Sequence, residues 1–189
     1  MILDDWFWAN VKFVVKFVEP ICDMLHYANT NAPCLGEIYE NMDSMCERSQ
    51  SITYRRDPTL WPQLQSFIHG QWNKLNTPLH MAAYAINPKW YVPTSGRRPP
   101  SQHREVVKGF VTIVKKFYGS SEEAYEIRSR FSQFARGRGV FGSQDSKTNR
   151  QKKKDTIDWW WLHGVNDPEL QQFAIWLLGK VVPHIAFVL

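Results

Sequence analysis

Residues 158–179 constrain the fold more than any other stretch, because three consecutive tryptophans stand directly before a well-delimited helix signal. Asp167 is placed to cap the first free N–H groups of that helix, Pro168 suits its first turn, and Gly179 predicts its end. Its apolar stripe consists of Leu170, Phe173, Ala174, Leu177 and Leu178, with Gln171 and Gln172 off it. Three adjacent tryptophans cannot all face one way. Two interpretations follow: a core helix under an aromatic lid, or a helix that docks on another domain or chain.

The rest of the chain repeats this helical periodicity. Apolar spacing predicts helices over residues 6–25, 35–52, 61–75, 79–85, 101–118 and from 121 to about 136, with Ser101 and Ser121 as candidate caps. Pro20 is expected to kink or divide the first helix, and the β-branched residues over 11–18 keep a strand possible there. Strand alternation is scarce elsewhere. The sequence therefore predicts a predominantly all-α protein, and its nine tryptophans argue against disorder.

Positive charge is concentrated in one segment. Residues 97–154 hold fifteen Lys and Arg against five Asp and Glu, whereas the whole chain has a net charge of only +5. Such a segment suits a nucleic-acid backbone, although a solvated surface has the same composition. The candidate nucleic-acid-binding residues are Arg97, Arg98, Arg104, Lys108, Arg136, Arg138, Lys147, Arg150, Lys152, Lys153 and Lys154. Residues 137–154 are rich in Gly, Ser and Lys, which predicts a mobile basic linker, and 151–154 resemble a nuclear localisation patch.

Several other kinds of chemistry have little support. Three widely spaced cysteines, Cys22, Cys34 and Cys46, predict reduced thiols in an intracellular protein. The acidic pairs Asp4/Asp5 and Asp155/Asp158 fit helix starts better than a metal site, and His80 fits a hydrogen-bonded structural histidine better than a catalytic base. We therefore predict no catalytic residue, no metal and no cofactor. Charges interrupt the N-terminal apolar run, so neither a signal peptide nor a membrane span is expected.

Four motifs occur in a fixed order along the chain. Residues 33–42 read PCLGEIYENM and residues 72–88 read WNKLNTPLHMAAYAINP. Residues 159–164 read WWWLHG and residues 168–175 read PELQQFAI. This ordered set resembles the C-terminal half of plant hAT-type transposase-like proteins, and the resemblance covers roughly residues 6–178.

The resemblance implies an RNase H-like catalytic core that is interrupted by a helical insertion and followed by a helical dimerisation region. Family members hold two metals with three carboxylates that must converge on one site. The first two acids of the family lie upstream of anything in this chain. The third belongs to a segment that is replaced here by residues 179–189, GKVVPHIAFVL, which contain no acid. The catalytic β-sheet core is thus expected to be missing, and no catalytic residue is carried over.

Together these observations predict three regions and one main function. Residues 1–136 correspond to the helical insertion, 137–156 to the basic linker, and 157–189 to a truncated dimerisation segment. The predicted function is association with itself or a related hAT-type protein, through Trp159, Trp160, Trp161, Leu170, Phe173, Ala174, Leu177 and Leu178. The alternatives are sequence-independent binding of DNA or another nucleic acid, and a transposon-derived remnant with no selected function. Neither a small-molecule substrate nor a membrane is predicted as a partner.

Overall fold

The chain is predominantly helical in the part that a computed structural model describes, residues 4–30, 32–93, 97–152 and 155–180. About 81% of it is helix, and no strand occurs among the described residues, which confirms the all-α prediction. None of the described helices combines the length with the low charge that crossing a membrane requires. The β-branched run over residues 11–18 lies inside helix α1, so the alternative of a strand there is wrong.

The helices divide into two compact units that differ from the predicted regions. Among the described residues, unit 1 contains 4–30 and 40–76, and unit 2 contains 32–39 together with 77–180 apart from the gaps given above. The boundaries predicted at 136/137 and 156/157 both fall inside unit 2. Contacts between helices that are distant along the chain define this unit, and such contacts leave no mark in local composition.

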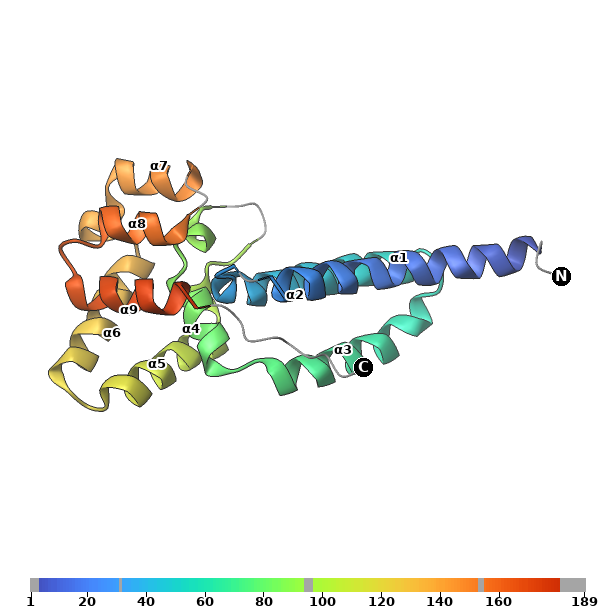
Figure 1. The fold of residues 1–189 in the computed structure, drawn as a ribbon, viewed down its shortest axis with the longest axis horizontal. Coiled ribbons are helices and arrows are strands. Elements are labelled where there is room, and N and C mark those ends of the chain that lie inside the picture. The colour runs from blue at the N-terminus through green and yellow to red at the C-terminus, as the bar shows by residue number, and fades with distance from the viewer. Residues whose placement is uncertain (1–3, 31, 94–96, 153–154, 181–189) are drawn as a thin grey trace. The chain divides into compact units, whose positions relative to one another are not determined.

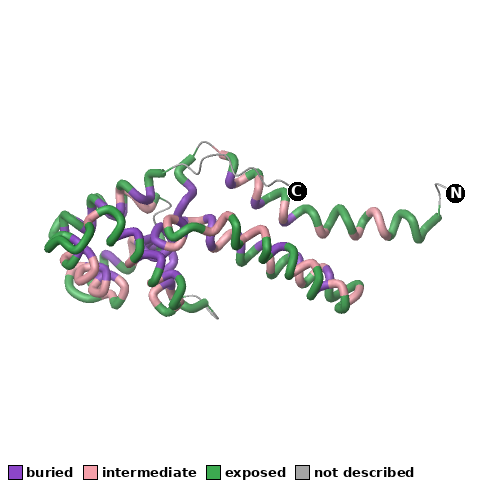
Figure 2. Tube along the Cα trace, turned by 90° about the horizontal axis from the view of Figure 1, so that it is seen from below, coloured by how far each residue is buried: buried purple, intermediate pink, exposed green. Residues whose placement is uncertain are grey.

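Unit 1 is built from long helices with few buried positions. It holds α1 (Asp5–Ala28), most of α2 (Leu35–Tyr54), the short 3-10 helix η1 (Pro58–Leu60) and α3 (Trp61–Leu75). Pro20 lies inside α1 without dividing it, so the helix is continuous. Asp23 of α1 pairs with Arg48 of α2 at 2.9 Å, and Arg56 lies 4.7 Å above the ring of Phe13. The first contact joins α1 to α2 and the second joins α1 to the turn after α2, while Figure 2 shows the first turns of α1 exposed.

Unit 2 contains the main core. Its elements after residue 77 are α4 (Pro78–Ile86), η2 (Pro88–Tyr91), η3 (Pro100–Gln102), α5 (Arg104–Tyr118), α6 (Glu122–Ala135), η4 (Gly139–Gly142), α7 (Gln144–Lys152), α8 (Thr156–His163) and α9 (Pro168–Leu178). In Figure 1, α7, α8 and α9 lie one beside the next. Ser121 caps α6 by accepting from the N–H of Ala124, as predicted, whereas His103 rather than Ser101 precedes α5.

Aromatic side chains fill the centre of unit 2. Phe110 of α5 is fully buried, stacks on Phe131 of α6 at 4.0 Å and meets Phe173 of α9 edge-on at 5.8 Å. Gly109 brings α5 close to α4, because a Cβ at this position would lie only 2.5 Å from the Cβ of Met81. The close approach of the two helices and the packing of the rings together form a well-packed centre of unit 2.

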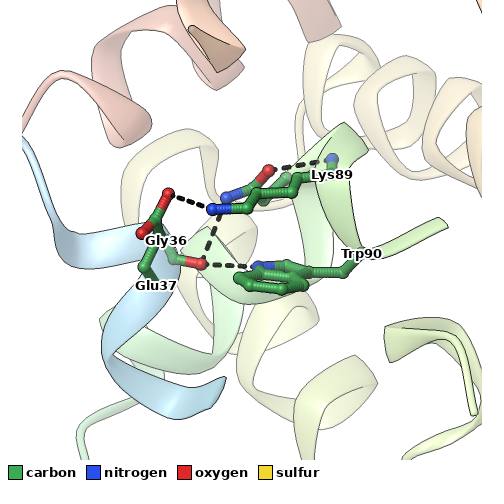
Figure 3. Close-up of polar contacts among 5 residues, drawn as sticks. Gly36, Glu37, Lys89 and Trp90 are labelled. Atoms are coloured by element: carbon green, nitrogen blue, oxygen red, sulfur yellow. Dashed lines mark hydrogen bonds and ion pairs between the residues drawn. The ribbon is translucent and has the colours of Figure 1, made fainter. Parts of the chain in front are cut away.

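The first residues of α2 join unit 2 through the carbonyl of Gly36. The side-chain amide of Asn87 donates to it over 3.2 Å and the indole N–H of Trp90 over 2.8 Å (Figure 3). Lys89 pairs with Glu37 at 3.0 Å beside this junction. Gly36 must stay small, because a Cβ there would lie 2.7 Å from Leu178 and 3.0 Å from Asn87.

Candidate functional site

The predicted partner-binding residues lie mostly in the core of unit 2. Seven of the eight are at most 4% exposed: Trp159, Trp160, Leu170, Phe173, Ala174, Leu177 and Leu178. Only Trp161 reaches the surface, with 61% of its area exposed. Within the chain, α4, α6 and α8 pack against α9 and cover its apolar stripe. The core-helix interpretation is the one that the structure supports.

Polar contacts tie the tryptophan run to the rest of the unit. The indole N–H of Trp160 donates to the carbonyl of Ile86 over 3.1 Å, and that of Trp159 donates to the carbonyl of Ser146 over 3.2 Å. Gln171, expected off the stripe, is buried and donates to the carbonyl of Trp160 over 2.9 Å. The same carbonyl also accepts from the backbone N–H of Gly164 over 2.9 Å, so Gln171 is its second donor at the end of α8.

Asp167 does not cap α9 with its side chain, contrary to prediction. Its carboxylate lies 3.2 Å from the guanidinium of Arg130 on α6 instead. Burial raises the pKa of Asp167, and the positive charge of Arg130 acts in the opposite direction. Pro168 and Gly179 occupy the first turn and the end of α9 as predicted.

The predicted basic residues fall into three groups. Eight of them are exposed: Arg97, Arg98, Arg104, Lys108, Arg136, Arg138, Lys147 and Lys152. Lys153 and Lys154 lie outside the described residues. Arg150 is only 7% exposed, so it is not on the open surface with the other eight.

Helix α7 explains the burial of Arg150. The hydroxyl of Ser143 accepts from the N–H of Ser146 over 3.1 Å and starts the helix. Ser146 and Arg150, four residues apart, form its buried face, and the Ser146 hydroxyl donates to the carbonyl of Phe141 over 3.2 Å. The prediction of a mobile linker over 137–154 is therefore wrong for residues 139–152, which form η4 and α7. Hydropathy misses this helix because its packing face is a serine and an arginine.

Three aromatic rings surround the guanidinium of Arg150. Its carbon lies 4.8 Å from the ring centre of Phe134, 5.0 Å from that of Trp159 and 5.6 Å from that of Tyr91. One amino group donates to the carbonyl of Phe134 over 3.5 Å, at the limit of a hydrogen bond, and Nε has no partner among the described residues. Burial lowers the pKa of Arg150 to about 10, so the group remains charged at neutral pH.

No described carboxylate neutralises this buried cation, which is unusual for a charged group. Arg48 in unit 1 offers a contrast. It lines a smaller cavity of about 210 Å³, and Asp23, which pairs with it, lines the same cavity. Cation–π contacts offset part of the free-energy cost of burying the Arg150 guanidinium, but they do not neutralise its positive charge.

A cavity of about 360 Å³ opens beside Arg150. Its charged and amide-bearing lining consists of Arg136, Gln144, Lys147, Arg150 and Gln151. The remaining lining consists of Tyr91, Val92, Pro93, Pro99, Ala135, Gly137 and Phe141. Three cations and no carboxylate line this space, which makes it a candidate site for an anion that also carries an apolar part.

The sequence predicted the positively charged residues of this cavity but not the apolar residues that line it. Arg136, Lys147 and Arg150 were among the predicted nucleic-acid-binding residues, whereas Tyr91, Pro93 and Pro99 were not predicted to belong to any site. The single local signal for the site is Ser143, a capping residue that would have indicated a helix in the basic segment.

The remaining candidates have structural roles. The hydroxyl of Thr77 lies 2.9 Å from Nδ1 of His80, and burial lowers the pKa of this histidine. Asp4 caps α1 and Asp155 caps α8, as the interpretation of helix-start charges predicts. No cluster of metal-binding side chains occurs among the described residues, and the three cysteines form no disulfide.

Comparisons with known proteins add no assignment. No family model, no curated protein and no solved structure matches this chain.

Proposed function

We propose that this protein binds nucleic acid through the phosphate backbone, using the cationic surface of unit 2. The observation that carries the proposal is the cavity in which Arg136, Lys147 and Arg150 meet without a carboxylate. Exposed lysines and arginines on α5 and α7 add positive charge to the same unit. Contacts of this kind recognise phosphate and carry no direct information about base sequence.

Salt dependence tests this proposal. Anisotropy of labelled oligonucleotides, single-stranded and duplex, would be measured between about 50 and 200 mM salt, where counterion release weakens backbone contacts steeply. We expect binding at the low end that falls linearly with the logarithm of the salt concentration. Absence of binding at 50 mM salt, or affinity that does not change with salt, would contradict the proposal.

Two double variants with equal charge change make the test specific. Arg136→Gln with Lys147→Gln removes two lining cations, and we expect the salt slope to fall by about 2. Lys12→Gln with Lys16→Gln removes two exposed charges from α1 in unit 1 and serves as the matched control. Equal losses from both pairs would show that general charge, not this surface, is responsible.

Kinship with plant hAT-type transposase-like proteins forms part of this proposal. Segments that carry the resemblance contact one another in unit 2, since Asn87 bonds to Gly36 and Trp160 bonds to Ile86. These contacts give the motifs a shared structural role within unit 2. We propose no catalysis for the chain, and a metal-dependent nuclease assay on the pure protein would overturn that view by a positive result. A nuclear location would suit nucleic-acid binding.

Association with a second copy or a related chain is the second candidate. Trp161, Leu162 and Val165 at the end of α8 are 61%, 53% and 65% exposed, which leaves an apolar surface open. Sedimentation at tens of micromolar would be compared between the native chain and Trp161→Ser. A native monomer at these concentrations would remove this candidate.

A further inference from the structure

We propose that the cavity beside Arg150 binds one unstacked nucleotide of a single strand, with its phosphate against Arg136 and Lys147 and its base against the rings of Tyr91, Pro93 and Pro99. The inference rests on the proposed nucleic-acid binding and adds to it a preference for single strands. Every residue that carries it lies in unit 2.

Charge is the first argument. Arg150 is more than nine-tenths buried, lines the cavity and has no carboxylate neighbour among the described residues. Its Nε lacks a hydrogen-bond acceptor in the part of the chain that the structure describes. An anion in the cavity would stand opposite this uncompensated charge, and the exposed side chains of Arg136 and Lys147 would hold it from the rim.

Size and wall chemistry identify the anion. A volume of about 360 Å³ exceeds the needs of a free phosphate and falls within the usual range for small organic ligands. Tyr91, Pro93 and Pro99 supply ring surfaces, which suit the flat apolar face of a base. A phosphate alone would leave these surfaces uncovered, and the acidic side chains of Asp and Glu carry no flat apolar group to place against them.

Two glutamine side chains explain why we expect the cavity to accept any of the bases. Gln144 and Gln151 line the cavity, and each amide both donates and accepts hydrogen bonds. They can therefore meet the polar edge of any base. Stacked bases inside a duplex cannot enter such a cavity, whereas an unstacked base of a single strand can.

A cavity-filling variant tests the proposal while keeping every charge. Gln151→Trp replaces an exposed lining residue of α7 with a large ring, and Gln172→Trp makes the same change at an exposed position of α9 outside the lining. Native chain and variants would be titrated with a labelled 12-nucleotide oligothymidylate and with a duplex of equal phosphate number at one salt concentration. Circular dichroism would verify that each variant is folded.

We expect the native chain to bind the single strand about tenfold more tightly than the duplex, a size that stacking of one base can supply. Gln151→Trp should weaken single-strand binding more than duplex binding and so abolish this difference, and Gln172→Trp should preserve it. Thymidine 5′-monophosphate should compete for the cavity better than inorganic phosphate or polyglutamate at equal concentration.

Results that contradict the cavity proposal can be told apart from results that contradict the proposed nucleic-acid binding. An unchanged single-strand preference in Gln151→Trp overturns the cavity proposal, while duplex binding still supports phosphate recognition. Equal competition by inorganic phosphate overturns the nucleotide assignment, and equal competition by polyglutamate does the same. If neither strand form binds at low salt, both the proposed function and this inference fail.

Discussion

The indole N–H of Trp160 donates to the carbonyl of Ile86, a residue 74 positions earlier in the chain, over 3.1 Å. Trp160 is fully buried, and its ring lies 4.9 Å from that of Phe134. This single side chain therefore connects α8 with the end of α4 and with α6. It anchors unit 2 internally, and so cannot also serve as an exposed contact for a partner.

Replacement of Trp160 by phenylalanine should destabilise unit 2. The smaller ring leaves the carbonyl of Ile86 without its donor in a buried place, which costs about 1–3 kcal/mol, and adds a cavity. Trp161→Phe, at a site that is 61% exposed, should change the unfolding free energy by less than about 0.5 kcal/mol. Urea unfolding followed by circular dichroism gives both values, and equal effects would contradict the assignment of Trp160 to the core.

Two glycine substitutions should act in opposite directions. Gly109→Ala places a methyl group 2.5 Å from the Cβ of Met81, and we expect a loss of about 1–3 kcal/mol from overpacking between α4 and α5. Gly70 in α3 has no atom within 4 Å of an added Cβ, so Gly70→Ala should stabilise its helix by about 0.5–1 kcal/mol. Thermal unfolding of the two variants measures the difference, and stabilisation by Gly109→Ala would show that the helices do not approach as described.

Removal of the Ser143 cap should loosen α7. Ser143→Ala deletes the hydroxyl that accepts from the N–H of Ser146, a loss typically of about 0.5–2 kcal/mol. Amide hydrogen exchange within α7 should become faster, whereas Ser120→Ala, at an exposed position before the α6 cap, should leave it unchanged. Rapid exchange over residues 144–152 in the native chain would restore the prediction of a mobile linker.

Acid should destabilise the chain partly through His80. Burial lowers the folded-state pKa of His80 below its ordinary value of 6.5, and the backbone N–H of Thr77 donates to its Nδ1 over 3.2 Å. The unfolded chain binds this proton more readily. Stability is therefore retained above pH 6.5 and decreases as the pH falls through the lower folded-state pKa, by at most about 1.4 kcal/mol per pH unit.

The variant His80→Gln isolates this contribution. Glutamine at the third helical position can still accept from the N–H of Thr77, as in a capping box, but it does not titrate. We expect the denaturant midpoint of the variant to decrease less steeply with falling pH below 6.5 than that of the native chain, because the contribution of His80 is removed. An identical pH dependence in both proteins would show that His80 titrates equally in the folded and unfolded chains.

Local signals were sufficient for most helix positions. Apolar spacing and capping residues predicted α1 to α6 and α9 to within a few residues, including the Ser121 cap and the end of α9 at Gly179. They failed at α7, where Ser146 and Arg150 take the buried positions that apolar residues usually fill. A helix whose packing face is polar has no hydrophobic period to detect.

The candidate site was predictable only in part. The concentration of positive charge in the sequence predicted Arg136, Lys147 and Arg150 as binding residues. It could not predict that Arg150 is buried among the rings of Tyr91, Phe134 and Trp159. Those rings come from segments up to 68 residues apart along the chain. Their convergence with the cations requires the whole packing of unit 2.

Helix content and helix limits are local properties, because spacing over one or two turns and a capping hydroxyl are sufficient to specify them. The direction in which Trp159, Trp160 and Trp161 point is not local. Trp159 and Trp160 are buried because Ser146 and Ile86 supply carbonyl acceptors and α6 supplies an aromatic neighbour. Trp161 remains 61% exposed among the described residues. Burial of a side chain depends on residues from distant parts of the chain. Only the tertiary structure therefore shows that the predicted interface residues lie mostly in the core and that part of the predicted basic linker lines a cavity.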